Sequence, residues 1–414
     1  MKGNWLCPAV SISLITAILS GCGGGGTTTY SEPPIYTRAE AMQHGAWTIL
    51  VYLDADNDLE SSGITNFNQM ELAGSTRNVR VIVQMDRKDG HDPDNESWTD
   101  TRRYLIIRDS DARVMRSIRL DDEPLGELDM GDWRTLRDFV EWGTAEFPAD
   151  HYCLIIWDHG TGWHIRAAVV GPDYKYVVID DTSASEMNVT EIPQALARVG
   201  IDVVAFDACL MQQLETAYEL RNSAAYMVGS AAPEPSPGYS YSKILRRMNG
   251  DTTPAELCRV IVQEYALAYP PPSKGITHSA LDLSAIADVA DATSTFAQVL
   301  IDNAAAYSAE LREARESSLN YSTATGGAQR YSLDLLDYAG RCASSLGRDA
   351  EAAYATLNEA MDGALVAETH NPDTPGAHGL ALYLPDPPNY AARYGLLGLA
   401  DDTLWDDWIR SQLQ

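Results

Sequence analysis

The sequence predicts an α/β protein with a mostly parallel sheet that is covered by helices on both faces. Residues 47–300 alternate short apolar runs, rich in β-branched side chains, with stretches of helical periodicity, which is the pattern of such a sheet. Two of the apolar runs lead directly into polar motifs, and ligand crevices form at the carboxyl ends of strands. The composition, 45% hydrophobic and 21% charged, is that of an ordinary folded protein, and 414 residues suffice for one large domain or two medium ones.

The predicted strands are short apolar and β-branched runs bounded by polar or turn-forming residues. They are residues 47–53, 79–86, 102–108, 152–157, 202–206, 225–230 and 276–282. The predicted helices repeat apolar side chains at three- and four-residue spacing. Thr190, followed by Pro193, provides cap chemistry at the start of one of them. The helices are residues 58–73, 132–147, 190–199, 209–222 and 253–268.

Two irregular segments and a change of character complete the organisation. Residues 164–188 predict a loop and a small hairpin, and residues 231–240 are too rich in proline for regular structure. Residues 284–370 are rich in Ala, Leu, Glu and Ser at helical spacing, which predicts a helical subdomain or insertion. The core is expected at 45–283, and residues 371–414 are expected to return to it. This last segment holds a predicted strand at 379–385 and a predicted helix at 401–413.

The charge is strongly acidic, with 59 Asp and Glu against 30 Lys and Arg, a formal net charge of −29. Neither nucleic acid nor an anionic lipid surface would approach such a field without a local basic patch. No cluster of Lys and Arg stands out in the sequence. We therefore expect no nucleic-acid partner.

The N-terminus predicts an export signal. An apolar run at 9–18, too short to span a bilayer, ends in the sequence LSGC at Cys22. This resembles a bacterial lipoprotein signal at 1–22, with Cys22 as the lipidated residue, and a Gly- and Thr-rich start makes 23–44 a flexible tether. The alternative is an ordinary secretory signal with a chance Cys. The lipoprotein interpretation places the protein in the bacterial cell envelope, held to a membrane through its lipid anchor only.

The cysteines that follow are too few for a disulfide scaffold. Beyond Cys22 there are four, at 153, 209, 258 and 342. Cys153 lies in a predicted strand and Cys258 in a predicted helix, so both are expected to be core residues. Cys209 differs because of the motif around it.

Two motifs carry the predicted chemistry, and each follows a predicted strand. Residues 157–163 read WDHGTGW and residues 206–211 read FDACLM, so His159 precedes Cys209 by 50 residues. A thiol near neutral pH is mostly protonated and needs an adjacent base, which His159 can supply. Taken singly, His159 is more simply a loop histidine, and Cys209 is more simply a buried apolar residue. Their joint position at strand ends favours a nucleophile–base pair.

The neighbours of this pair have predicted roles of their own. Gly160 leaves room for a close approach of backbone and for N–H groups that point at an oxyanion. Trp163 is expected to wall the cleft, and a helix beginning at Cys209 would bring positive partial charge to the sulfur. Asp207 lies two residues before Cys209 and on the same face of the strand. It would oppose thiolate formation unless it binds a cationic substrate group; otherwise it is a capping carboxylate.

The ordered motifs resemble the clostripain family of cysteine peptidases, in the caspase-like clan. The resemblance covers roughly residues 45–390 and rests on the two motifs above together with four further stretches. They are WTILVYLDADNDLE at 47–60, ETAYEL at 215–220, YSLDLLDY at 331–338 and HGLALYLP at 378–385. It implies a caspase-like three-layer α/β/α sandwich. It also implies His159 as the catalytic histidine, Cys209 as the nucleophile, Asp207 as the residue that binds a basic side chain, and an oxyanion hole from the amides of Gly160 and Cys209.

One stretch departs from the family pattern. After the strand that ends at Ser230, family members carry acidic residues and a Pro-Gly-Asp-Gly-Trp-like loop. Here residues 231–241 contain a single acidic residue, Glu234. Glu234 is therefore the remaining candidate there for substrate binding.

Calcium is a further expectation, because some clostripain relatives depend on it. Asp54, Asp56 and Asp58 match the start of an EF-hand loop, but Leu59 and Thr65 occupy its sixth and twelfth positions, which rejects that motif. A looser calcium site remains one interpretation, and solvated or capping carboxylates are the other.

The predicted function is that of a cysteine endopeptidase that cleaves peptides or proteins after Arg or Lys through an acyl-enzyme. The alternative is a non-catalytic, membrane-anchored lipoprotein that binds peptides or partners on the same scaffold. A metal-dependent hydrolase is disfavoured, because no His and Asp cluster with ligand spacing occurs. Lys175, in the segment between the two motifs, is a candidate site of self-cleavage, since related peptidases are processed there after a basic residue. The alternative is that Lys175 is an ordinary lysine beside the hairpin and that the chain is active intact.

Overall fold

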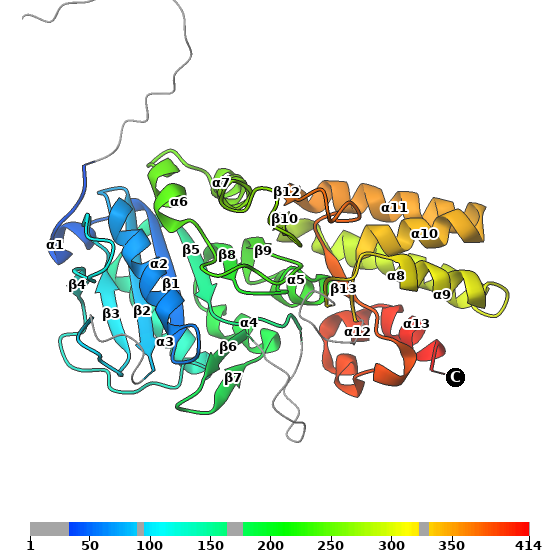
Figure 1. Cartoon of the computed structure of the whole chain (residues 1–414), viewed down its shortest axis with the longest axis horizontal. Coiled ribbons are helices and arrows are strands. Elements are labelled where there is room, and N and C mark those ends of the chain that lie inside the picture. The colour runs from blue at the N-terminus through cyan, green and yellow to red at the C-terminus, as the bar shows by residue number, and fades with distance from the viewer. Residues whose placement is uncertain (1–32, 89–94, 164–176, 323–330, 414) are drawn as a thin grey trace, which may run out of the picture. The chain divides into compact units, whose positions relative to one another are not determined.

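The computed structural model describes residues 33–88, 95–163, 177–322 and 331–413. Their centre is a nine-stranded sheet in the order β12-β10-β9-β8-β5-β1-β2-β3-β4 (Figure 1). Its middle is parallel, and the outer strands on both sides are antiparallel. The strands are β1 (Gly45–Ala55), β2 (Val79–Arg87), β3 (Arg102–Leu105), β4 (Ile118–Arg119), β5 (Ala149–Trp157), β8 (Ile201–Asp207), β9 (Ala224–Gly229), β10 (Thr277–Asp282) and β12 (Leu365–His370). The α/β class and the mostly parallel sheet are confirmed.

Side chains of the central strands alternate between two separate cores. In β1, Leu50 and Tyr52 pack into one hydrophobic cluster, whereas Ile49 and Val51 pack into the other. Successive side chains of a strand point to opposite faces, so a strand buried on both faces reads as a continuous apolar run. Every residue of β1 is buried, as this layering requires.

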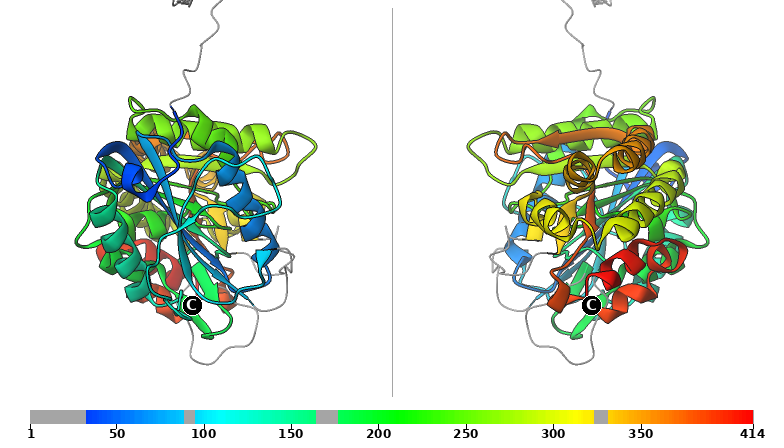
Figure 2. Two further views of the ribbon diagram at one scale, coloured as in Figure 1. Left: turned by 90° about the vertical axis from the view of Figure 1, so that its left-hand side faces the viewer. Right: turned by 90° about the vertical axis from the view of Figure 1, so that its right-hand side faces the viewer.

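Helices cover both faces of this sheet, as the end-on views show (Figure 2). One cluster takes side chains from α2 (Glu60–Ala73), α6 (Tyr241–Arg247) and α7 (Pro254–Ala268). The other takes side chains from α3 (Trp133–Glu146), α4 (Ile192–Leu196) and α5 (Leu214–Leu220). The short η2 helix (Val189–Glu191) precedes α4, and β6 (Val177–Asp180) and β7 (Ser185–Met187) form the small hairpin expected between the motifs.

The C-terminal third is less uniformly helical than the sequence predicts. It holds η3 (Leu283–Ala285), α8 (Ile286–Asn303), α9 (Ser308–Ser317), α10 (Leu335–Leu346) and α11 (Arg348–Ala364), but residues 365–370 form β12 and residues 332–334 form β11. β12 pairs with β10 and so ends the central sheet. Only this tertiary partner makes the segment a strand, because its own sequence continues a helical stretch.

The last segment returns to the core in part. The expected strand at 379–385 is β13 (Ala381–Tyr383), but it pairs with β11 (Ser332–Asp334) in a separate two-stranded sheet. Short η5 (Pro387–Asn389) and η6 (Ala392–Leu396) helices then lead to α12 (Gly398–Asp402) and α13 (Trp405–Ser411). Trp405 and Trp408 of α13 are buried in the same cluster as Leu50.

The segment expected to be a tether is ordered at its end. Ile35 is 3% exposed and its N–H donates to the carbonyl of Ser75. Thr37 caps the short helix α1 (Arg38–Ala41) through a capping box with Glu40. A flexible tether therefore cannot extend to residue 44, because Ile35 and Ala41 already pack on the core. Cys22 lies outside the described residues.

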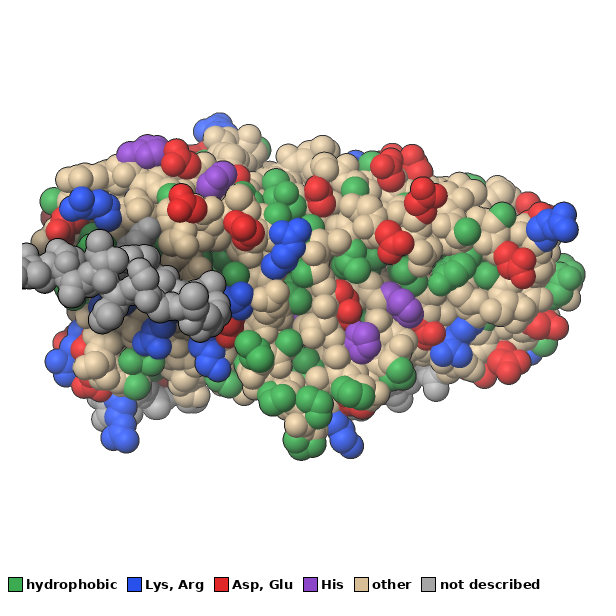
Figure 3. All heavy atoms as spheres, turned by 90° about the horizontal axis from the view of Figure 1, so that it is seen from above, with side chains coloured by type: hydrophobic (Ala, Val, Ile, Leu, Met, Phe, Trp, Pro, Cys, Tyr) green, Lys and Arg blue, Asp and Glu red, His purple; other side chains and the backbone are tan. Residues whose placement is uncertain are grey.

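The face of the molecule that is seen from above carries charges of both signs (Figure 3). On the face seen from above, Lys and Arg side chains are scattered among more numerous Asp and Glu (Figure 3). No helix in the described ranges is both long enough and apolar enough to cross a membrane.

Candidate active site

The sheet register brings the two predicted motifs together. β5 and β8 are parallel neighbours, and Trp157 of β5 is paired with Asp207 of β8. His159 and Cys209 each lie two residues beyond this pair, at the carboxyl ends of adjacent strands. Crevices of open α/β sheets form at these ends.

A glycine holds the histidine loop against the cysteine turn. A Cβ atom on Gly160 would lie 2.3 Å from the carbonyl oxygen of Cys209 and 3.0 Å from Sδ of Met211. Gly162 has φ +75°, and a Cβ there would collide with the side chain of Gln213. Both glycines are therefore required by close approach.

Trp163 does not wall the pocket, contrary to our expectation. It is 1% exposed, and its backbone N–H donates to Oε1 of Gln213. Its ring packs edge-on against those of Tyr383 and Tyr394, with 4.7 and 4.9 Å between ring centroids. An apolar ring at the end of the motif loop is buried more favourably in the core than in a water-filled cleft. Trp163 anchors the loop, and Trp157 lines the pocket instead.

The helix expected to begin at Cys209 begins five residues later, at Leu214. Residues 209–213 instead form a turn in which Leu210 has φ +62°. The N–H of Leu210 donates to the carbonyl of Ala232, and that of Gln212 donates to the carbonyl of Ser230. These bonds to the following loop compete with helix formation, so α5 does not begin at Cys209.

A backbone amide, and not a helix N-terminus, contacts the sulfur of Cys209. The N–H of Glu234 donates to Sγ of Cys209 at 3.2 Å. A hydrogen bond from a donor stabilises negative charge on the acceptor, which favours the thiolate form.

Carboxylates position the histidine. Nε2 of His159 lies 2.8 Å from Oδ1 of Asp58, in the turn after β1. The backbone is held by Asp158, which is 4% exposed and accepts hydrogen bonds from the N–H of His159 and from Nδ2 of Asn57. The N–H of Ile179 in β6 also donates to Asp158. The sequence indicates Asp58 as a calcium ligand or as a solvated or capping carboxylate, and its contact with His159 could not be predicted because it spans 101 residues.

His159 and Cys209 line one pocket of about 230 Å³. Its other walls come from the β1–α2 turn, the ends of β5 and β8, and the proline-rich loop. They are Leu59, Ser62, Trp157, Asp158, Asp207, Ala208, Glu234, Pro235, Ser236, Pro237 and Gly238. Two larger surface depressions, of about 410 and 420 Å³, include no Cys or His among their described lining residues.

Two buried carboxylates, Asp207 and Glu234, belong to this pocket. Asp207 is 5% exposed and accepts hydrogen bonds from the N–H of Tyr239 and the hydroxyl of Tyr241, at 2.8 Å for the latter. Burial raises the pKa of Asp207 to about 6, against the lowering effect of these hydrogen bonds. A Cβ on Gly238 would lie 2.2 Å from Asp207 Oδ1, so only glycine lets the loop pass there.

The carboxylate of Glu234 has fewer hydrogen-bond donors around it than that of Asp207. Its side chain is 5% exposed, and no backbone N–H or hydroxyl group among the described residues donates to it. It shares a side-chain hydrogen bond with Asp207. Burial, and then the neighbouring Asp207, raise the pKa of Glu234 well above its usual range. Oε1 lies 3.6 Å from Nε2 of His278, but burial lowers the pKa of that histidine to about 3, so it is neutral. Within the described chain, neither pocket carboxylate has an ion pair with Lys or Arg.

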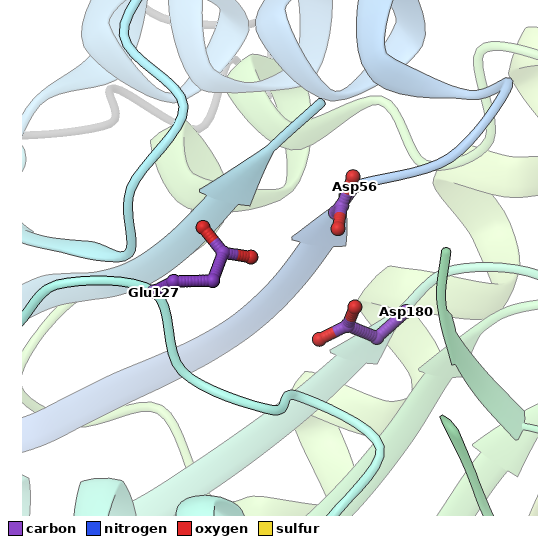
Figure 4. Close-up of side chains that lie close together, drawn as sticks. All are labelled: Asp56, Glu127 and Asp180. Atoms are coloured by element: carbon purple, nitrogen blue, oxygen red, sulfur yellow. The ribbon is translucent and has the colours of Figure 1, made fainter. Parts of the chain in front are cut away.

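A second acidic group lies beside the histidine loop. One carboxylate oxygen each from Asp56, Glu127 and Asp180 lie within 4.8 Å of one another, an arrangement that could bind a metal such as calcium (Figure 4). The looser site suggested by the sequence is only partly right. Asp54 accepts the N–H of Asp56, and Asp58 pairs with His159, so of those three residues only Asp56 belongs to the cluster. Lys175 lies outside the described residues.

Residues 51–411 match the family model described as the clostripain family, peptidase C11. The chain belongs to the clostripain family. The match spans both motifs and the described helical region.

Individual relatives agree with this membership. The chain is 30% identical to clostripain of Hathewaya histolytica over 273 residues, 58% of this chain and 51% of that protein, so it spans about half the length of this curated relative. Its fold is similar to that of a secreted C11 cysteine protease from Bacteroides thetaiotaomicron with an irreversible peptide inhibitor, at TM-score 0.63 and 19% identity. That likeness covers 89% of this chain and 99% of the other. An inactive zymogen C11 protease from Parabacteroides distasonis is similar at TM-score 0.65 and 20% identity, over 87% and 99%. At these identities the structures show the shared fold.

Proposed function

We propose that the protein is a cysteine endopeptidase in which Cys209 is the nucleophile and His159 the general base. His159 takes the thiol proton, and Sγ attacks the carbonyl carbon of the scissile bond. The developing oxyanion accepts hydrogen bonds from the backbone N–H groups of Gly160 and Cys209. The backbones of these two residues lie side by side. The C–N bond breaks as His159 returns the proton to the leaving amine, and water then hydrolyses the thioester.

Asp58 would act as a positioning residue for the histidine. Its pair with Nε2 would orient the ring so that proton exchange with the sulfur runs through Nδ1. It would also stabilise the imidazolium that forms when the thiol is ionised.

The preferred substrate residue before the scissile bond is Arg or Lys. The observation that carries this is the pair of buried carboxylates, Asp207 and Glu234, without Lys or Arg partners among the described residues. Buried charges are costly unless they are paired, so a cationic side chain fits this pocket far better than a neutral one.

A basic substrate would also assist the nucleophile. The carboxylate of Glu234 interacts electrostatically with Cys209, and negative charge nearby opposes thiolate formation. A cationic side chain bound between the carboxylates and the thiol would cancel this field. Binding of the correct residue would thus favour the reactive form of Cys209.

Reporter peptides with Arg, Lys or Ala before a fluorogenic leaving group test this function on the purified protein lacking residues 1–32. We expect hydrolysis of the Arg and Lys peptides and none by Cys209→Ala. Tight peptide binding by the wild type without turnover under any tested condition would instead favour the non-catalytic lipoprotein.

Export and lipidation at Cys22 are part of the proposal, and one structural relative is described as secreted. Labelling of cells with an alkynyl fatty acid should modify the wild type and not Cys22→Ala. Labelling of neither protein would leave the ordinary secretory signal as the explanation.

Maturation by self-cleavage after Lys175 is also proposed. The described chain resumes at Val177 in β6, whose Ile179 donates to Asp158 beside His159. One structural relative is described as an inactive zymogen. Wild type should yield two fragments on a denaturing gel, whereas Cys209→Ala and Lys175→Ala should each yield one band. A single band from an active wild-type preparation would contradict this step.

A further inference from the structure

Two adjacent buried glutamines follow the cysteine motif, and their side chains differ in hydrogen bonding. Gln212 is 0% exposed, and neither its Oε1 nor its Nε2 has a partner among the described residues. Gln213 is 1% exposed, its Oε1 accepts the backbone N–H of Trp163 at 3.2 Å, and its Nε2 donates to Oγ of Ser332 at 3.4 Å. The side chain of Gln213 thus joins three segments, which are the histidine loop (residues 158–163), the cysteine turn (residues 209–213) and β11.

The end of the histidine loop fits closely against this side chain. Gly162 has φ +75°, and a Cβ atom there would lie 2.1 Å from Oε1 of Gln213. Glycine therefore lets the loop backbone reach Gln213. The next N–H, that of Trp163, is then directed at Oε1. The side chain at position 213 thereby places the backbone three residues after His159.

The backbone of Gln213 is itself anchored on two sides. It directly precedes α5, and its carbonyl accepts the N–H of Ala217 in that helix. It also forms an isolated bridge with Ala381 of β13, whose N–H donates to the carbonyl of Gln212. Because these contacts use backbone atoms, a substitution at position 213 removes the contact with the histidine loop while the support remains.

The two ends of the histidine loop are held by different parts of the fold. Its start is fixed by Asp158, which accepts the N–H groups of His159 and Ile179. Its end is held by Gln213, which belongs to the same turn as Cys209. Because the loop is tied to the turn that carries the sulfur, this contact controls the separation of the imidazole and the thiol.

We propose that Gln213 is a positioning residue that sets the distance between His159 and Cys209 by holding the end of the histidine loop against the cysteine turn. This role depends on the proposed function, because Gln213 acts through that catalytic pair. Gln213 is not among the described residues that line the pocket. A displacement of about 1 Å between reacting groups can cost about a hundred-fold in rate. Loss of the contact should therefore lower turnover rather than substrate binding.

Gln213→Met in the protein lacking residues 1–32 tests this role. Methionine keeps the length and the unbranched shape of the side chain, but its thioether is only a weak acceptor for the N–H of Trp163. With an Arg reporter peptide, kcat should fall by about ten- to a hundred-fold. KM should stay within about two-fold of wild type, because the pocket is unchanged.

Alkylation by iodoacetamide measures the catalytic pair independently of turnover. Without residues 1–32 the chain has four cysteines, and Cys153, Cys258 and Cys342 are buried, so the reagent reports on Cys209. An adjacent imidazole lowers the pH at which the sulfur reacts, because it favours the thiolate. In Gln213→Met the midpoint of the pH–rate profile should rise by about one pH unit or more, toward the value of about 8.5 for a free thiol. A role in stability alone would lower the unfolding temperature and leave this profile unchanged.

Two variants serve as controls. Gln212→Met should keep kcat and the alkylation profile, because that side chain has no hydrogen bond to lose among the described residues. Gln213→Glu keeps an oxygen for the N–H of Trp163 and should retain at least about three-fold more of kcat than Gln213→Met. A packing role would give the opposite order, since a buried carboxyl group is less favourable than a thioether.

Ser332→Ala keeps the test open if Gln213→Met does not fold. It removes the second hydrogen bond of Gln213 and should lower kcat by about three-fold. In that case, wild-type turnover by Ser332→Ala would overturn the role of Gln213.

If Gln213→Met does fold, three results would overturn the role. They are a kcat within about two-fold of wild type with an unshifted alkylation profile, an equal loss in Gln212→Met, and a kcat of Gln213→Glu no higher than that of Gln213→Met. Each of these leaves Cys209→Ala inactive, so the proposed function would stand. Activity retained by Cys209→Ala would instead contradict the proposed function, and the role of Gln213 with it.

Discussion

Replacement of Glu234 by Gln tests the acidic pocket with little structural disturbance. The side chain keeps its size, and the amide can still share a hydrogen bond with Asp207. A carboxylate about 4 Å from a cation contributes about 4 kcal/mol at an effective dielectric constant of about 20. The cation gives up hydration on entry, and Glu234, whose pKa is raised by burial and by Asp207, must ionise to pair with it. We therefore expect a net loss of about 2–3 kcal/mol.

This loss corresponds to a fall of about 30- to 160-fold in kcat/KM for an Arg substrate. The value for an Ala substrate should change little, because it makes no ion pair. The assay is the ratio of kcat/KM for the two peptides at pH 7.5. Ser236→Ala, another pocket residue but uncharged, is the matched control and should keep the ratio. An unchanged ratio in Glu234→Gln would refute the role of this carboxylate.

The same pocket predicts a pH dependence. Asp207 is protonated below its pKa of about 6 and then cannot pair with a cation. Since kcat/KM reports the free enzyme, the preference for Arg over Ala should be high above pH 6 and fall as the pH drops through that value. A preference that stays constant from pH 5 to pH 8 would exclude Asp207 as the selecting charge.

Three further predictions concern the catalytic geometry. Cys209→Ala and His159→Ala should each lower kcat/KM by about three orders of magnitude or more, because the pair acts as a unit, whereas Cys153→Ala, in the core, should lower the unfolding temperature and leave turnover intact. Gly160→Ala should lower kcat strongly at a stability cost of about 1–3 kcal/mol, since the new methyl would meet the Cys209 carbonyl at 2.3 Å; kcat within two-fold of wild type would contradict the packing argument. Asp58→Asn should lower kcat and move the acid limb of the kcat/KM profile to lower pH, because the imidazolium loses its carboxylate partner; an unshifted limb would mean that Asp58 is not a positioning residue.

The central sheet could be predicted from the sequence because its strands are buried on both faces. A strand such as β1 must then be apolar throughout, and the helices that follow must show an apolar stripe. The same logic places His159 and Cys209 at strand ends, where the chain leaves the core. What the sequence alone determined is thus the layer architecture and which chemically reactive residues face the crevice.

Other features depended on partners distant in the chain. β12 became a strand because β10 offered an open edge, and residues 209–213 stayed out of a helix because the loop at 230–234 supplied hydrogen bonds. Trp163 is buried because its ring packs against the rings of Tyr383 and Tyr394. In each case a tertiary contact outweighed a local preference worth at most about 1 kcal/mol per residue.

The convergent carboxylates illustrate the same limit. The sequence shows Asp56, Glu127 and Asp180 as three unremarkable acidic residues, the outer two 124 positions apart. They meet because strand register and loop path carry them to one point. The hydrophobic periodicity of the sequence predicts which side chains are buried, because burial selects the residue type at each position separately. Which of them meet is set by the pairing of strands and the paths of loops, and that is decided only when the chain folds.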